Sequence, residues 1–195
     1  MAAMIAKRYR ALALPLLVTP LLLACAQAPE GPERVIEPRV SASAAPRGSV
    51  LLKSVMPAAH NRARGEVGVA PLVWSDTLAG SARGYAEEMA RTGRFEHAVQ
   101  PMGPGRQGEN LWTGTRGAYR FDEMVGYWIA ERRDFVNLPT PNFSRTGRWQ
   151  DVGHYTQMVW RGSTAVGCAI ASNRSDDYLV CRYAPPGNVF GQVAF

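Results

Sequence analysis

The amino-acid sequence predicts an α+β fold, in which helices pack against an antiparallel sheet. Two observations lead to this class. In two segments, residues 75–93 and 121–133, apolar residues recur on one helical face, which is typical of amphipathic helices. Near the C-terminus, two β-prone runs flank a cluster of turn-forming residues, which is typical of a β-hairpin. The 195 residues are enough for one domain with a substantial core.

Residues 1–24 are typical of a secretory signal peptide. Lys7, Arg8 and Arg10 form a basic start, and residues 11–23 are almost wholly apolar. This run is shorter than the about 20 residues that cross a membrane, and two prolines interrupt it. Removing the signal lowers the formal net charge from +6 to +3, because three basic residues and no acidic ones leave with it. A charge of +3 is too mild to indicate nucleic-acid binding.

Leu22–Cys25 resembles a bacterial lipobox, in which cleavage before the cysteine leaves an acylated N-terminal residue. An ordinary signal peptide with an incidental cysteine is the other interpretation, but Cys25 stands where cleavage is expected. Several acyl chains hold a protein stably to a membrane. We therefore expect an exported lipoprotein. Its location would be the outer membrane and periplasm of a Gram-negative cell, since no Asp follows Cys25, or otherwise the cell surface.

Residues 25–49 are rich in proline and alanine and lack apolar periodicity, so they are predicted to be a tether, and residues 50–195 the folded domain. Three helices are expected within the domain, over Val50–Glu66, Ser75–Gly93 and Phe121–Arg133. In the first, Pro57 requires either Ser54 as the N-cap, which places the proline in the first turn, or a kink. In the second, Ser75 is the expected N-cap and Gly93 the C′ residue.

The predicted hairpin contains two cysteines. Val166–Ala171 and Tyr178–Tyr183 are the β-prone runs, and residues 172–177 are the turn. An antiparallel register centred on this turn places Cys168 opposite Cys181, within reach of a disulfide. Such a bond is expected in an oxidising compartment. Two buried free thiols or a metal pair are the alternatives, although a zinc cluster would need further thiols nearby.

Four motifs follow one another along the chain: His60–Arg64 (HNRAR), Gly108–Leu111 (GENL), Gly153–Ser163 (GHYTQMVWRGS) and Tyr178–Val189 (YLVCRYAPPGNV). Together they resemble the CAP superfamily, the cysteine-rich secretory, antigen 5 and pathogenesis-related-1 proteins. The resemblance implies an α-β-α sandwich with a central antiparallel sheet. It also implies that Cys168 and Cys181 are bridged. The chain lacks the further disulfides of many eukaryotic members, which fits a compact bacterial member.

The resemblance further implies a cleft lined by two histidines and two glutamates, which match His97, Glu109, Glu131 and His154. Imidazoles bind Zn²⁺ and similar ions, and carboxylates orient such ligands or supply charge. The candidate cofactor is therefore a divalent metal, Zn²⁺ or Mg²⁺. If the protein is an enzyme, Glu109 or Glu131 is the general base. A hydrogen-bonded network that joins four elements is the alternative. We expect the remaining histidine, His60, to be structural.

The sequence favours a binding module over an enzyme, because no motif fixes a third strong metal ligand and no nucleophile elbow is present. The expected partner is a small hydrophobic ligand, lipid or sterol-like, or a peptide, and we expect a monomer. The alternatives are a metal-dependent hydrolase of peptides or envelope material, and a non-catalytic protein that interacts with a host or the envelope. Phe135, Phe143 and Trp149 mark a further candidate surface, unless their loop folds back on the domain.

Overall fold

The computed structural model describes residues 43–195, so the predicted signal peptide, Cys25 and most of the predicted tether lie outside the described residues. The helices of this part are α1 (Ser49–Glu66), α2 (Asp76–Thr92), α3 (Phe121–Ala130), α4 (Gly153–Met158) and the 3₁₀ helices η1 (Glu131–Asp134) and η2 (Trp149–Val152). Its strands are β1 (Val73–Trp74), β2 (Gly108–Thr115), β3 (Ala165–Ser172) and β4 (Asp176–Ala184). No helix of residues 43–195 is both long and apolar enough to cross a membrane.

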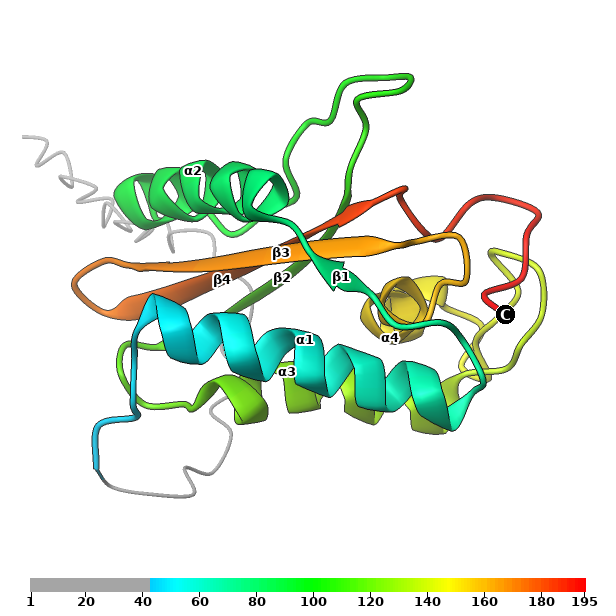
Figure 1. The fold of residues 1–195 in the computed structure, drawn as a ribbon, viewed down its shortest axis with the longest axis horizontal. Coiled ribbons are helices and arrows are strands. Elements are labelled where there is room, and N and C mark those ends of the chain that lie inside the picture. The colour runs from blue at the N-terminus through cyan, green and yellow to red at the C-terminus, as the bar shows by residue number, and fades with distance from the viewer. Residues whose placement is uncertain (1–42) are drawn as a thin grey trace, which may run out of the picture. The chain divides into compact units, whose positions relative to one another are not determined.

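The elements form three layers, and the middle layer is one sheet with the strand order β1-β3-β4-β2. α2 covers one face of the sheet, while α1 and α3 cover the other, and α4 lies at the end where the C-terminus is marked (Figure 1). The pairs β3–β4 and β2–β4 are antiparallel. The short edge strand β1 pairs with β3 in parallel, which departs from a purely antiparallel sheet. The α+β class and the α-β-α sandwich are therefore confirmed.

The first helix begins before Ser54, which decides against one of the two arrangements predicted for Pro57. α1 starts at Ser49, with Gly48 as N-cap and Pro57 inside the helix. Ser54 as N-cap is therefore wrong, and its hydroxyl donates instead to the Leu51 carbonyl. Proline lacks an N–H, so the carbonyl four residues earlier has no helical donor. The packing of the buried side of α1 offsets this loss.

The segment before α1 is attached to the domain. The Ala45 N–H donates to the Gly117 carbonyl at 2.8 Å. Arg47 forms an ion pair of 2.6 Å with the buried Asp177, and its guanidinium lies over the Phe121 ring, 5.4 Å from the centroid. These contacts extend the folded body back to Ala45, into residues that the sequence assigned to the tether.

Both predicted ends of the second helix are confirmed. The Ser75 hydroxyl accepts the Leu78 N–H at 3.2 Å, as an N-cap side chain does. At the other end Gly93 adopts the left-handed conformation with φ 72°, and its N–H donates to the Met89 carbonyl. A residue without Cβ adopts this conformation without steric cost, which is why glycine ends helices so often.

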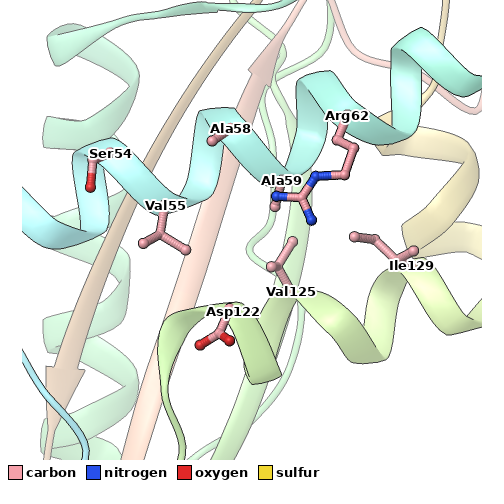
Figure 2. A pocket seen from close by; sticks show the side chains of 8 residues that line it. All are labelled: Ser54, Val55, Ala58, Ala59, Arg62, Asp122, Val125 and Ile129. Carbon is pink, nitrogen blue, oxygen red and sulfur yellow. The ribbon is translucent and has the colours of Figure 1, made fainter.

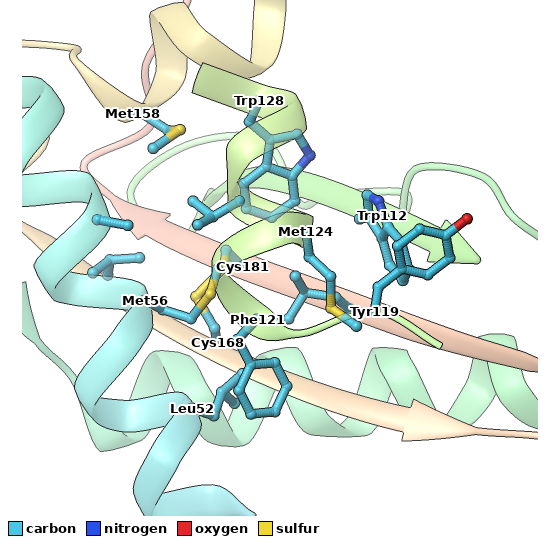
Figure 3. Close-up of a cluster of buried hydrophobic side chains, with 14 of the residues drawn as sticks. Leu52, Met56, Trp112, Tyr119, Phe121, Met124, Trp128, Met158, Cys168 and Cys181 are labelled. Carbon is cyan, nitrogen blue, oxygen red and sulfur yellow. A yellow bond between two sulfur atoms is a disulfide. The ribbon is translucent and has the colours of Figure 1, made fainter. Parts of the chain in front are cut away.

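Cys168 and Cys181 form the predicted disulfide and are opposite each other in the β3–β4 register. The free-thiol and metal-pair alternatives are therefore wrong. The bond lies in the apolar core between the sheet and the helices α1 and α3, beside Met56 and Phe121 (Figure 3). Closing a loop with a sequence separation of 13 stabilises the fold by roughly 3 kcal/mol on the chain-entropy model.

The edge strand β2 carries the GENL motif and was not predicted as a strand. Gly108, Asn110 and Gly114 are poor strand formers, so the local sequence conceals it. β2 is antiparallel to β4 along its whole length, with Glu109 opposite Arg182. Because side chains alternate along a strand, Glu109 and Asn110 point to opposite faces of the sheet.

Candidate functional site

His154 lies in the first turn of α4 and is held by Glu131, the first residue of η1. The Nδ1 atom of His154 is 2.6 Å from Oε1 of Glu131. The other carboxylate oxygen accepts the backbone N–H groups of His154 at 2.9 Å and Tyr155 at 3.0 Å, so the carboxylate satisfies free donors at the helix start. The imidazole stacks on Trp128, with centroids 5.9 Å apart. Trp128 packs inward and Glu131 lies at the rim of the core.

His97 lies in the loop between α2 and β2 and is held by Glu109. Its Nδ1 atom is 2.7 Å from Oε1 of Glu109, which also accepts the Ala98 N–H at 3.0 Å. The second oxygen, Oε2, lies 2.8 Å from Nη2 of Arg182. The His97 side chain is 63% exposed, whereas those of Glu109 and Arg182 are only 5% and 6% exposed. The guanidinium of Arg182 lies over the Tyr85 ring, 5.3 Å from the centroid.

The four predicted residues thus form two His–Glu pairs. Asn110, next to Glu109 in β2, donates to the His154 carbonyl at 3.0 Å. The neighbouring Glu109 contacts His97 from the opposite face, so the two pairs approach the same end of β2 from its two sides. Over residues 43–195, no group of three or more His, Cys, Asp or Glu side chains is arranged to hold a metal ion.

The geometry of each pair fits histidine as a metal ligand and glutamate as the residue that orients it. A carboxylate that accepts a hydrogen bond from Nδ1 fixes the tautomer whose Nε2 is unprotonated and can bind a cation. His97 and His154 are therefore the candidate ligands. Imidazole ligands suit Zn²⁺, whereas Mg²⁺ requires an octahedral set of oxygen ligands, so the donor types favour zinc.

His60 has the structural role that the sequence predicts. Its ring is fully buried, with Nδ1 2.7 Å from the Met56 carbonyl and Nε2 2.7 Å from the Tyr183 hydroxyl. Desolvation by burial lowers the pKa of His60 from 6.5 to about 4, so the ring is neutral near pH 7. Burial also raises the pKa of Tyr183 well above its usual value, so its hydroxyl stays protonated.

Arg64, in the same motif, fixes α1 to the segment around α4. Its guanidinium donates to four carbonyls, those of Ala70, Met158, Trp160 and Ser163, at 2.6–2.9 Å. Desolvation by burial lowers its pKa to about 10, so it remains cationic near pH 7. The sequence does not indicate this role of Arg64, because the role depends on carbonyl groups that only the folded chain brings together.

Residues 58–183 match the family described as the cysteine-rich secretory protein family, CAP. The chain belongs to this family. A pathogenesis-related protein of PR-1 type from Sambucus nigra is 39% identical over 135 residues, which cover 69% of this chain and 76% of the relative. Pathogenesis-related protein 1 from Arabidopsis thaliana is 36% identical over 137 residues, covering 70% and 78%. The secretory character of the family agrees with the predicted export.

Solved structures share the fold of this CAP domain. One is NaASP2 crystallised with Zn²⁺, with a TM-score of 0.64, 23% identity and coverage of 75% of this chain and 86% of that chain. Another is Schistosoma mansoni venom allergen-like protein 4, with a TM-score of 0.56, 19% identity and coverage of 74% and 95%. At these identities the likeness establishes the architecture.

The C-terminal loop of the CAP domain is tied to α4 through side-chain amides. Nδ2 of Asn188 donates to the Gly153 carbonyl at 2.9 Å, and its Oδ1 accepts the Thr156 hydroxyl at 2.6 Å. Oε1 of Gln157 accepts the Gly187 N–H at 2.8 Å. Asn188 thus ties this loop to the body of the domain. These bonds hold the element that carries His154.

The loop of residues 135–148 folds back on the domain. Phe143 is fully buried, and Phe135 packs against Phe143 and Tyr155 with centroids 6.5 Å and 5.5 Å apart. Trp149, at the end of the loop, is 43% exposed. The interpretation of all three aromatic residues as one binding surface is therefore wrong, since two of them contribute to packing.

A pocket of about 300 Å³ lies between α1 and α3 (Figure 2). It is lined by Ser54, Val55, Ala58, Ala59, Arg62, Asp122, Val125 and Ile129. Most of these side chains are apolar, and the two charged groups come one from each helix. None of the four predicted site residues contributes to it. Its size is at the lower end for small-molecule pockets.

Proposed function

We propose that this CAP protein is an exported binding module, anchored to the envelope through Cys25, that binds a divalent cation at the two His–Glu pairs and captures a small ligand in the pocket between α1 and α3. The observation that supports this most strongly is the shared geometry of the two pairs. The distance from Nδ1 to carboxylate oxygen is 2.7 Å at His97 and 2.6 Å at His154. Both rings are thereby oriented to offer Nε2 to a cation.

The contacts of the glutamates support binding rather than hydrolysis. A general base needs a carboxylate oxygen within reach of the attacking water. Glu131 already accepts from the His154 ring and from two backbone N–H groups. Glu109 accepts from His97 and Ala98 and forms an ion pair with Arg182. The contacts of each carboxylate therefore fit the orientation of its histidine and not the activation of a water molecule.

Calorimetric titration of the full chain with Zn²⁺ tests the cation site. We expect saturable binding that is at least about tenfold weaker after His97→Ala or His154→Ala, because each substitution removes one ligand. The matched control is Asp76→Ala, which removes a carboxylate that is 81% exposed at the start of α2, and it should bind like the unsubstituted chain. Equal affinity in all four proteins would reject both histidines as ligands.

The pocket between α1 and α3 supports a hydrophobic ligand as the captured molecule. Ala58 lines it and is exposed, so Ala58→Trp should fill the space without disturbing the core. We expect a fluorescent fatty-acid probe to bind at least about tenfold more weakly to this variant. Glu87→Trp, at an exposed position of α2, is the control. An unchanged probe affinity in Ala58→Trp would exclude this pocket.

The anchor is tested by Cys25→Ala. We expect the variant to leave the membrane fraction and to lose the mass of the acyl groups, because stable anchoring requires more than one lipid chain. Fractionation and intact-mass analysis of the exported protein measure both. A variant that stays in the membrane fraction, together with an unacylated parent protein, would contradict the anchor.

A further inference from the structure

The loop that carries His97 is held at its base by groups on the α2 side of the sheet. The Tyr85 hydroxyl donates to the Glu96 carbonyl at 2.6 Å. Burial, and then the charge of Glu109, raises the pKa of Tyr85, so the hydroxyl keeps its proton. Oε1 of Glu109 accepts from the His97 ring and from the Ala98 N–H. Three successive residues of the loop are therefore fixed by two side chains.

Arg182 lies next to both of these side chains, Tyr85 and Glu109. It is opposite Glu109 in the β2–β4 register, and its side chain is 6% exposed. Its Nη2 is 2.8 Å from Oε2 of Glu109, and its guanidinium lies over the Tyr85 ring. The Nε atom of Arg182 and Oε2 of Glu109 have no partner with hydrogen-bond geometry, so charge and stacking hold the pair.

A buried carboxylate needs this compensation. Without a nearby cation, the desolvated charge of Glu109 would be uncompensated, and the side chain would turn toward solvent. This movement would remove the acceptor that faces His97 and Ala98. The pair at His154 needs no such arginine, because two backbone N–H groups at the start of α4 donate to Glu131.

We propose that Arg182 is a positioning residue for His97. By pairing with Oε2 it turns Oε1 of Glu109 toward the loop, which fixes His97 with an unprotonated Nε2 and holds the loop at Ala98. The expected effect of Arg182 on cation binding rests on the proposed function. Its effect on the position of His97 does not depend on that function.

Nitrogen-15 NMR of the full chain at a fixed pH of about 8, where an ordinary histidine with a pKa near 6.5 is neutral, tests this role. In Arg182→Met we expect His97 to lose its single tautomer and the Ala98 amide to exchange at least about tenfold faster. The His154 tautomer and the Tyr155 amide are the internal reference and should not change. Arg182→Lys keeps the charge and should restore His97 toward its original state.

An unchanged His97 tautomer and Ala98 exchange rate in Arg182→Met would overturn the proposal. Equal acceleration at Ala98 and Tyr155 would also overturn it, because it would indicate general destabilisation. If Arg182→Met does not fold, Arg182→Gln, which is neutral but polar, is measured in the same way with the same criteria.

The cation measurement separates this inference from the proposed function. Zn²⁺ titration of the same variants should show about tenfold weaker binding in Arg182→Met, the usual cost of losing a partner that orients a metal ligand. If the unsubstituted chain binds no Zn²⁺, the proposed cation site fails, while the NMR criteria still decide the role of Arg182.

Discussion

The two His–Glu pairs of this CAP domain have the same chemistry in different surroundings. His154 lies in the first turn of α4, stacks on Trp128 and is paired with a carboxylate that also accepts backbone N–H groups. His97 lies exposed in a loop, and its carboxylate is compensated by the buried Arg182. Local secondary structure thus supports one pair, and a cross-strand ion pair supports the other. The more exposed histidine therefore depends on the more buried carboxylate.

This difference predicts that Glu109→Ala has the largest effect on stability. It leaves the Arg182 guanidinium buried without an anion, and breaking a buried pair costs about 3–5 kcal/mol. Urea denaturation measures the loss in free energy of unfolding. The double variant Glu109→Ala/Arg182→Met should recover part of it, because no unpaired charge remains. A loss below about 1 kcal/mol would show that the pair is not a buried ion pair in solution.

His60 gives a third case for comparison with the two pairs, because its buried ring is hydrogen-bonded to a carbonyl and a hydroxyl instead of a carboxylate. Its pKa is about 4 in the folded protein and near 6.5 in the unfolded chain, so only the unfolded state binds a proton between these values. The contribution of the buried, neutral His60 ring to the free energy of unfolding is fully present above pH 6.5 and is lost as the pH falls to about 4. We expect the free energy of unfolding to fall by about 1.4 kcal/mol per pH unit in this window.

Urea denaturation of the parent chain and His60→Gln at several pH values measures this effect. Subtracting the two profiles removes the contribution of carboxylates, which titrate in the same range. Parallel profiles would contradict the assigned pKa of His60.

Glu131→Ala should cost less than Glu109→Ala. It removes the acceptor for two N–H groups at the start of α4 and for the His154 ring. These donors remain partly accessible to water, so we expect a loss of about 2 kcal/mol, as for a strong helix cap. Urea denaturation beside Glu109→Ala gives the order of the two effects. The reverse order would contradict the proposed difference between the pairs.

The histidines themselves should show the smallest effects and the same contrast. His154→Ala removes the ring stacked on Trp128, and we expect a loss of about 1 kcal/mol. His97→Ala removes an exposed side chain, and the change should stay within about 0.5 kcal/mol. Thermal unfolding of both variants measures the contrast. Equal losses would indicate that His97 is packed in solution.

Several elements follow from the sequence because they depend on neighbours in the chain. Ser75 and Gly93 bound α2 through contacts with residues three and four positions away. The turn formers between the last two strands set the register that brings Cys168 to Cys181. Other elements depend on distant partners. α1 starts before Ser54 because the packing of its buried side offsets the hydrogen bond that Pro57 cannot donate. β2 forms despite its glycines because β4 pairs with it.

The sequence by itself determined the family, the three long helices and the hairpin, and it proposed the histidines and glutamates of the candidate site. Only the tertiary structure decided that His97 pairs with Glu109 and His154 with Glu131, across 12 and 23 positions of the chain. It also decided that Arg182, in another strand, compensates the buried Glu109. Local patterns report a residue's neighbours within a few positions, whereas burial and charge pairing depend on the segments that the fold brings together.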